Sequence, residues 1–349
     1  MLTPFTNDIK AKLFAHIPPD WQALKYIAEK WMEKDLPPET GIPMACCQYA
    51  GGNALQATGV TAALLAGAIS LRILDDLSDK DRVDTLWNVA GENRAWNFAF
   101  AFKMISLQIL HTAIIDNERR NHVQEVYLDK LMQMGAGQDM DLSNRAATFE
   151  SYWKMMDLKA GTPFGCAAWL GAVAVSANRD IWNACYAYGH HLGLAIQILN
   201  DREGIWSGKS VSDLDRGKVT LPLLYALYCE HTHKERVQAI VNEGTVSTHA
   251  SWLRGVLEEI EAPQYLVWAA WQHRSEALAA IQNGGGKAAG ARILEAYVNG
   301  IFGDLVPDGT LTNSQAFALP QADVSADRNS VPNKDAEYRS ASLRLRQRI

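Results

Sequence analysis

The sequence is poor in charge and in cysteine, and each shortage excludes a class of protein. Charged residues make up 21% of the 349 residues and hydrophobic residues 48%, so the chain can bury a large core and is not a disordered protein. The formal net charge of −6 excludes a nucleic-acid-binding protein that works through bulk positive charge. The five cysteines form no Cys-x-x-Cys pair, so we expect no disulfide framework and a reducing, cytoplasmic location.

Two long stretches, 40–71 and 160–178, contain no charged residue at all. Neither is purely apolar over the ~20 residues that a membrane-spanning helix needs. Gly51-Gly52-Asn53 interrupts the first stretch, and Pro163 interrupts the second. We therefore expect core helices and no stable membrane span.

The pattern of apolar residues predicts an all-α protein. Apolar residues recur at the three- and four-residue spacing of helices, and the alternating patterns of strands are nearly absent. The helical pattern covers residues 19–34, 54–77, 91–116, 119–134, 180–204, 219–231, 250–261 and 264–282. It fails beyond residue 306, so we expect one helical domain over residues 1–306 and a flexible C-terminal tail over residues 307–349.

A cluster of acidic residues, Asp75-Asp76-Leu77-Ser78-Asp79, closes one apolar helix. Residues four apart lie on one face of a helix, so Asp75 and Asp79 repel each other beside an apolar segment. A hard divalent cation such as Mg²⁺ would relieve this repulsion. The alternative interpretation is a solvated acidic helix end.

A second apolar helix, 193–204, also ends in oxygen-bearing side chains, those of Asn200, Asp201 and Glu203. Lys209 and Lys218 follow it. Because Mg²⁺ neutralises a diphosphate and lysines hold it as point charges, two such helix ends indicate a cavity for a diphosphate bridged by cations.

Four stretches, in this order, make the sequence resemble the trans-isoprenyl diphosphate synthase (polyprenyl synthetase) family, which shares its all-helical fold with class I terpene synthases. They are the acidic cluster 75–79, the Gly-Gln-x-x-Asp-Leu segment 137–142, Lys159 within 156–160, and the segment 197–222. The resemblance implies a helical bundle around a central apolar cavity, an allylic prenyl diphosphate substrate and, as is usual for this fold, a homodimer.

The resemblance also implies a role for each matching residue. The metal ligands that it implies, for two or three Mg²⁺ ions, are Asp75, Asp79, Asn200, Asp201 and Glu203. The side chains that would support the metal or bind the diphosphate are Asp76, Arg82, Lys159, Gln197, Lys209 and Lys218.

The sequence departs from the family's pattern at several places, including Ala68, where the family has His or Gln, and Arg82, where it has Arg-Arg-Gly. A chain-elongating synthase binds isopentenyl diphosphate through an upstream Gly-Lys-Arg segment, but the corresponding residues 35–40 contain no paired basic residue. The second acidic motif reads Asn200-Asp201-x-x-Gly204, so its third aspartate is missing. Charge-assisted hydrogen bonds contribute roughly 1.5–3 kcal/mol each, so the loss of the basic residues weakens the binding of a second diphosphate. The missing site favours intramolecular cyclisation.

A few residues indicate how the prenyl chain is enclosed. Phe98 and Phe102, four apart, form an aromatic stripe that can stabilise a carbocation or, alternatively, pack in the core. Ser70 and Leu71 precede the acidic cluster where the family uses bulky side chains to shorten the cavity, so a C15 or longer chain is permitted. We expect the pair His190-His191 on the helix surface and not at the metal, since hard Mg²⁺ prefers oxygen.

These observations give one leading hypothesis and two alternatives. The leading hypothesis is a Mg²⁺-dependent terpene cyclase that ionises an allylic prenyl diphosphate and releases diphosphate. The first alternative is a trans-prenyltransferase, which elongates a prenyl chain or alkylates a non-isoprenoid acceptor such as an indole. The second is a non-catalytic partner subunit of a prenyl diphosphate synthase.

Overall fold

Every regular element in the described residues is a helix. The structure, a computed structural model, describes residues 5–33, 38–79, 90–143, 148–208, 211–303 and 305. The α-helices are α1 (Thr6–Phe14), α2 (Gln22–Met32), α3 (Ile42–Tyr49), α4 (Thr58–Asp79), α6 (Glu92–Ala113), α7 (Asn117–Leu142), α8 (Phe149–Met156), α9 (Thr162–Val173), α10 (Arg179–Trp206), α11 (Leu221–Tyr228), α12 (Lys234–Asn242), α13 (Ala250–Glu259), α14 (Ala262–Asn283) and α15 (Ala288–Phe302). One turn of π-helix, η4 (Asp157–Gly161), joins α8 to α9. The prediction of an all-α fold is confirmed.

Capping side chains set where α7 and α8 begin. Asp116 accepts a hydrogen bond from the backbone N–H of Arg119, and Thr148 forms a capping box with Ser151. Such caps stabilise a helix start by about 1 kcal/mol each. Pro163 instead lies in the first turn of α9, where its missing N–H would have no partner in the helix. The chain therefore restarts as a new helix after α7, and α8 can pack against α7.

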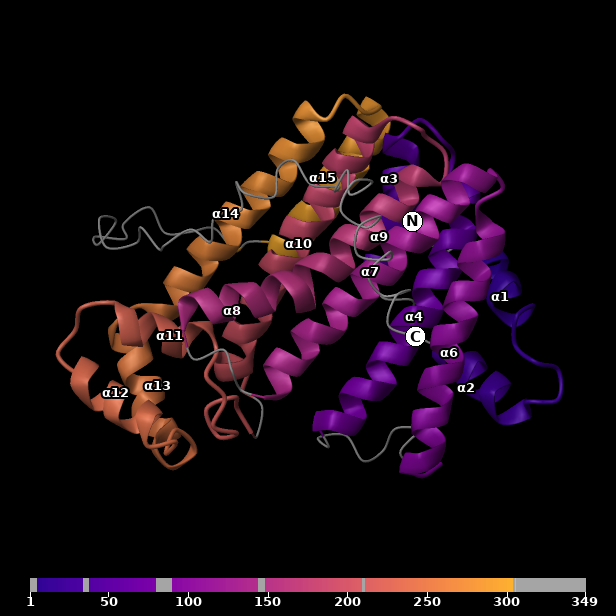
Figure 1. Cartoon of the computed structure of the whole chain (residues 1–349). Coiled ribbons are helices and arrows are strands. Elements are labelled where there is room, and N and C mark those ends of the chain that lie inside the picture. Colours follow the sequence, from indigo (N-terminus) through magenta and orange to yellow (C-terminus); the bar gives the residue numbers. More distant parts are fainter. Residues whose placement is uncertain are drawn as a thin grey trace, which may run out of the picture. The chain divides into compact units, whose positions relative to one another are not determined.

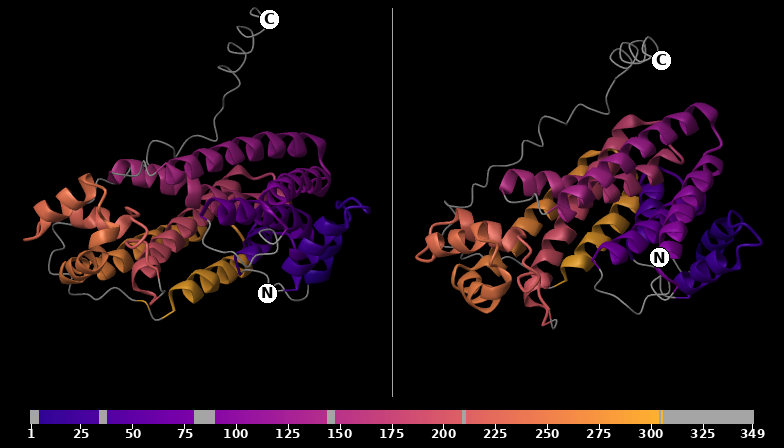
Figure 2. Two further views of the ribbon diagram at one scale, coloured as in Figure 1. Left: turned by 90° about the horizontal axis from the view of Figure 1, so that it is seen from below. Right: turned by 60° about the horizontal axis from the view of Figure 1, so that its bottom comes forward.

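The core is built from three extensively packed helix pairs: α4 with α6, α10 with α14, and α10 with α9. In Figures 1 and 2 the indigo N-terminal helices and the orange helices α12 and α13 lie at opposite ends of this core. Trp169, Leu170 and Val173 of α9 are at most 4% exposed. The uncharged stretch 160–178 therefore contains a core helix, as predicted.

The other uncharged stretch also contributes to the core. Ala54–Ser78 is long and apolar enough to cross a membrane, but 72% of its most apolar window is buried inside the protein. The core helices of soluble proteins share this property, so one such helix is weak evidence for a membrane span.

The chain divides into a compact unit over residues 1–310 and a second unit over residues 311–349. The predicted tail, 307–349, lies outside the described residues, so the domain boundary at residue 306 stays a prediction.

Candidate active site

The two acidic motifs lie at the C-terminal ends of α4 and α10, and the end of α7 lies on the same side of the bundle (Figure 1). Asp75 is half-buried on α4, and Gln138 of α7 donates a hydrogen bond from Nε2 to its Oδ1 at 3.4 Å. Asp76 is buried, and its Oδ1 lies 3.3 Å from Nε of Arg72. Among the described residues the hydrogen-bond partner of Asp75 is a neutral amide, so this carboxylate can take a cation, whereas Asp76 is already ion-paired with Arg72. Asp79 ends α4, and its side chain lies outside the described residues.

The π-turn η4 brings Lys159 to α7. Its ammonium forms an ion pair with Asp141, three residues beyond Gln138. The two side chains are 29% and 30% exposed, so the pair contributes at most about 1 kcal/mol and Lys159 can exchange it for phosphate oxygens at low cost. This approach requires Gly137, because a Cβ atom there would lie 2.7 Å from the backbone nitrogen of Lys159. The ends of α4 and α7 and the π-turn thus form one polar cluster.

Asp201, at the end of α10, is 4% exposed and accepts three hydrogen bonds. Tyr152 Oη donates to its Oδ2 at 2.5 Å, Gln197 Nε2 donates to its Oδ1 at 2.9 Å, and the backbone N–H of Leu221 donates to Oδ2 at 3.2 Å. Burial raises the pKa of Asp201 to about 6, and the three hydrogen bonds oppose that rise. The Asp201 carboxylate is therefore hydrogen-bonded to α8, to its own helix α10 and to the start of α11. Gln197 contributes to this set of contacts, and its predicted role toward the diphosphate stays a prediction.

The remaining polar candidates are more accessible. Asn200 and Glu203 are exposed on α10. Lys218 is half-buried, and its backbone N–H donates to the carbonyl oxygen of Asp213 at 2.9 Å, so a turn fixes its position. Its ammonium forms no hydrogen bond or ion pair with the residues that the structure describes, and it is therefore available to an anion. Two further candidates, Arg82 and Lys209, lie outside the described residues.

The oxygen donors suit a cation that is shared with a phosphorylated substrate. Asp75, Asn200 and Glu203 offer the oxygens that Mg²⁺ prefers, whereas those of Asp201 already accept hydrogen bonds. Within the described ranges, no three His, Cys, Asp or Glu side chains gather closely enough to hold a metal by themselves. Mg²⁺ is commonly bound by one or two carboxylates together with substrate phosphates, and the side chains present fit that arrangement.

The residues expected to enclose the prenyl chain differ in their surroundings. Ser70 is buried and Leu71 is 40% exposed, both on α4. Phe98 and Phe102 are buried on α6. The ring of Phe98 lies 6.3 Å from that of Trp21, next to α2, so this contact favours the core interpretation of the aromatic stripe.

The expectation that His190 lies on the helix surface is wrong. His190 is 8% exposed, and its Nε2 is hydrogen-bonded to Oδ1 of Asp157 in the π-turn. The neighbouring His191 is half-buried, with its Nδ1 3.1 Å from Nδ1 of His273 on α14. The reason is that α10 packs between α9 and α14, which leaves it no wide solvent-facing side.

Sequence reasoning assigned no role to Gln138, Asp141 or Tyr152. The first two lie in the Gly-Gln-x-x-Asp-Leu segment, so that signal was present. Tyr152 lies 49 residues before its partner Asp201, and no local pattern in the sequence joins them.

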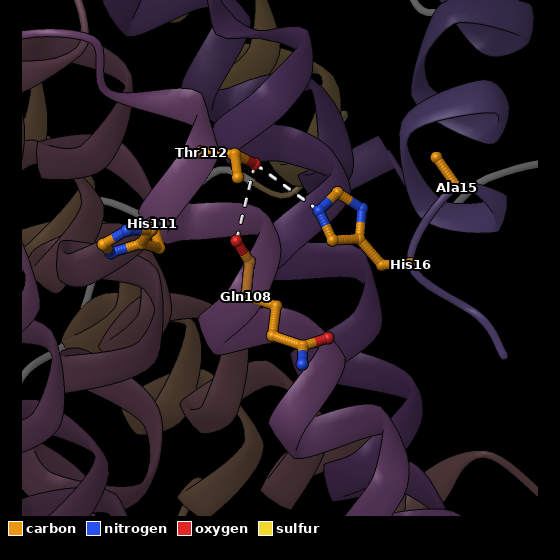
Figure 3. A pocket seen from close by; sticks show the side chains of 5 residues that line it. All are labelled: Ala15, His16, Gln108, His111 and Thr112. Carbon is orange, nitrogen blue, oxygen red and sulfur yellow. Dashed lines mark hydrogen bonds between the residues drawn. The ribbon is translucent and has the colours of Figure 1, made fainter.

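A separate pocket lies between the end of α1 and the C-terminal part of α6, and is lined by Ala15, His16, Gln108, His111 and Thr112 (Figure 3). Thr112 Oγ1 lies 3.5 Å from Nε2 of His16, while Gln124 is hydrogen-bonded to Nδ1 of His111 at 2.9 Å. Since α6 begins on the motif side of the bundle and ends at this pocket, the pocket is remote from the polar cluster and has no part in its chemistry.

Comparison of the sequence with known proteins identifies the family of the chain. Residues 56–256, more than half of the chain, match the model of the polyprenyl synthetase family. The chain is 31% identical to the geranylgeranyl diphosphate synthase of Mycobacterium tuberculosis over 198 residues, which cover 52% of this chain and 56% of that protein. It is 29% identical to the tryptophan prenyltransferase ComQ of Bacillus subtilis subsp. natto over 150 residues, 41% of this chain and 45% of that protein. The matches thus span about half of each relative.

The fold agrees with that assignment. The crystal structure of the geranylgeranyl pyrophosphate synthetase of Pyrococcus horikoshii superposes with a TM-score of 0.72 at 22% identity, and covers 84% of this chain and 94% of that one. The chain belongs to the polyprenyl synthetase family.

Proposed function

We propose that the protein is a Mg²⁺-dependent trans-prenyltransferase that ionises an allylic prenyl diphosphate of C15 or longer. The observation that carries this proposal is the contact path from Asp75 through Gln138 and Asp141 to Lys159. This path brings a carboxylate, whose partner among the described residues is a neutral amide, and an exchangeable lysine to the ends of neighbouring helices. Those are the two kinds of charge that a cation-bridged diphosphate requires.

The chemistry follows from these charges. When the C1–O bond of an allylic diphosphate breaks, the diphosphate leaves with the bonding electrons and an allylic carbocation remains. Lys159 and Lys218 bind the phosphate oxygens as point charges and so favour this departure. Asp75, Asn200 and Glu203 are the residues that would hold Mg²⁺, which when bound neutralises the charge of the leaving group.

The cyclase hypothesis favoured by the sequence is replaced by prenyl transfer. The matched family is the polyprenyl synthetases, and the relatives above are named for a diphosphate synthase and a tryptophan prenyltransferase. The departures from the family pattern therefore bear on the acceptor more than on the class of reaction.

The family relation favours isopentenyl diphosphate as the acceptor. An indole is the second candidate, supported by the similarity to a tryptophan prenyltransferase and by the lack of paired basic residues at 35–40. Of those residues, 35–37 lie outside the described part of the chain. A non-catalytic subunit is disfavoured, because Asp75 and Lys218 keep their charges available.

Two further expectations remain part of the proposal. A homodimer is supported by Trp96, Phe100 and Met104, which lie four residues apart along α6 and are 49%, 65% and 37% exposed. Cross-linking or ultracentrifugation tests the dimer. A reducing cytoplasm is supported by five free cysteines, four of them buried.

The experiment that tests the proposal is a matrix of substrates. The purified protein is incubated with Mg²⁺ and geranyl, farnesyl or geranylgeranyl diphosphate, each alone, with isopentenyl diphosphate, or with a tryptophan-containing peptide. We expect a prenylated product only when an acceptor is present. A hydrocarbon formed with no acceptor, or no consumption of any allylic substrate, would contradict prenyl transfer.

A further inference from the structure

The π-turn that carries Lys159 is an unusual local structure. Both the backbone N–H and the Oγ1 of Thr162 donate hydrogen bonds to the carbonyl oxygen of Asp157, which closes the wider i to i+5 turn. Single π-turns inside helices are rare and often lie at functional sites. Contacts with other helices must therefore hold this turn in place.

Two helices close on the π-turn through glycines. Gly137 of α7 faces Leu158, and a Cβ atom there would lie 2.7 Å from the Cβ of that residue. Gly193 of α10 faces the other side, where a Cβ atom would overlap the carbonyl oxygen of Ala160. Such contacts bring the backbones close together, but they lack the direction of a hydrogen bond and do not fix how the turn is rotated.

The directional contact is the bond between Asp157 and His190. Asp157 Oδ1 is bonded to Nε2 of His190, whose ring lies against Gly161. The ring of Tyr186 stacks on the imidazole with centroids 6.0 Å apart, and the ring of His191 meets it edge-on at 5.4 Å. The buried imidazole is thus held in one orientation, and it holds the aspartate in turn.

Asp157 and Lys159 act on different sides of the same turn. Residues two apart on a helical turn do not face the same way, and accordingly Asp157 bonds to α10 while Lys159 reaches Asp141 on α7. The Asp157 side chain is 53% exposed, so its bond adds little to overall stability. The bond between Asp157 and His190 instead fixes an orientation, because it limits rotation of the turn from which Lys159 projects.

We propose that His190 is a positioning residue which, through Asp157, fixes the π-turn and so aims the Lys159 ammonium at the diphosphate. This inference rests on the proposed function, because Lys159 matters here only if a diphosphate binds.

The test is a double-mutant cycle between His190 and Lys159. H190F keeps a ring of similar size and removes the hydrogen bond, whereas H190Q keeps an N–H donor. H191F is the matched control, since it keeps a ring edge-on to the imidazole of His190 and removes the hydrogen bond between His191 and His273. The Kd for inorganic diphosphate with Mg²⁺ is measured by calorimetry, and KM and kcat with the allylic substrate that the matrix identifies. Each variant is also made in a K159M background.

We expect H190F to raise the Kd for diphosphate about tenfold, the effect of losing one weak charge-assisted hydrogen bond. H190Q and H191F should stay within about threefold of the wild type, and H190F should have no further effect in the K159M background. D157A, which removes the oxygen that is bonded to His190, serves as a second variant and should match H190F.

Three results would count against this account. If K159M weakens diphosphate binding and neither H190F nor D157A does, the inference is wrong and the proposed function stands. If H190F costs as much in the K159M background as alone, its role is general to the fold and not positional. If the wild-type protein binds no diphosphate at all, the proposed function itself fails.

Discussion

The hydroxyl of Tyr152 is expected to stabilise the protein more than its burial alone suggests. It donates to the buried carboxylate of Asp201 at 2.5 Å, and hydrogen bonds to charged groups contribute about 1.5–3 kcal/mol against about 0.5–1.5 kcal/mol for neutral pairs. Tyr188 is the matched control. It is also fully buried, but its hydroxyl donates to the neutral carbonyl of Leu294 at 2.9 Å.

The difference between the two tyrosines should depend on pH. The folded-state pKa of Asp201 is raised to about 6, so this carboxyl makes the fold less stable as pH rises from its ordinary pKa toward 6. The hydrogen bond from Tyr152 favours the ionised form of Asp201. Removing the Tyr152 hydroxyl therefore raises the pKa of Asp201 further and enlarges the loss of stability as pH rises. Y152F should therefore lower the free energy of unfolding by about 1.5–3 kcal/mol near pH 8 but by only about 0.5–1.5 kcal/mol near pH 5.

The assay is urea denaturation of the metal-free protein in the presence of a chelator, for the wild type, Y152F and Y188F at both pH values. Y188F should lower the free energy of unfolding by about 0.5–1.5 kcal/mol at either pH. Equal losses for the two variants at high pH, or a loss for Y152F that does not change with pH, would refute the reasoning.

Three shorter predictions concern the rest of the described fold. Burial lowers the pKa of the half-buried Lys103 to about 8, so the wild type should gain stability as pH rises from about 8 to about 10.5. In urea denaturation, K103M should remove this pH dependence and raise the free energy of unfolding by about 1–3 kcal/mol at neutral pH. Burial lowers the pKa of His273 to about 4, so the stability of the fold should fall as pH drops from about 6.5 toward 4. In thermal unfolding, the stability of H273Q should depend less on pH over this range. The same pH dependence in H273Q and the wild type would contradict the lowered pKa of His273. F98A should cost about 3–5 kcal/mol in urea without changing product length, because Phe98 packs against Trp21, and a changed product length would return it to the wall of the cavity.

The helices and the residues of the acidic motifs could be predicted because their signals are local. Uncharged, periodic segments predicted the core helices, and short strings of residues located Asp75 and Lys159. Their contacts with Gln138 and Asp141 depend on where α7 ends relative to α4 and η4, which spacing along the chain does not encode.

What the sequence left open, and its one error at His190, have physical causes of the same kind. Periodicity shows that Phe98 and Phe102 lie on a buried face, but not which neighbour covers that face. His190 was predicted on the surface because a polar pair usually faces solvent, whereas α10 is covered on two sides. Asp201 resembles a metal ligand in sequence and stays a candidate, but its hydrogen bonds come from the distant Tyr152 and Leu221, which no local pattern reveals.

The catalytic importance of the α4 end can be tested by comparing D75N with D129N, which alters an exposed aspartate of α7 whose Oδ2 accepts a hydrogen bond from Gln133. Loss of a ligand to the cation that would neutralise the leaving group should lower kcat by about a hundredfold or more in D75N and leave D129N near the wild type.

The most direct test of the account is the release of diphosphate from farnesyl diphosphate in the presence of Mg²⁺ and an acceptor. The account predicts release by the wild-type protein that matches prenylated product one to one and that falls steeply in D75N and K218M. Release no faster than in the buffer alone, or release that survives both substitutions, would contradict it.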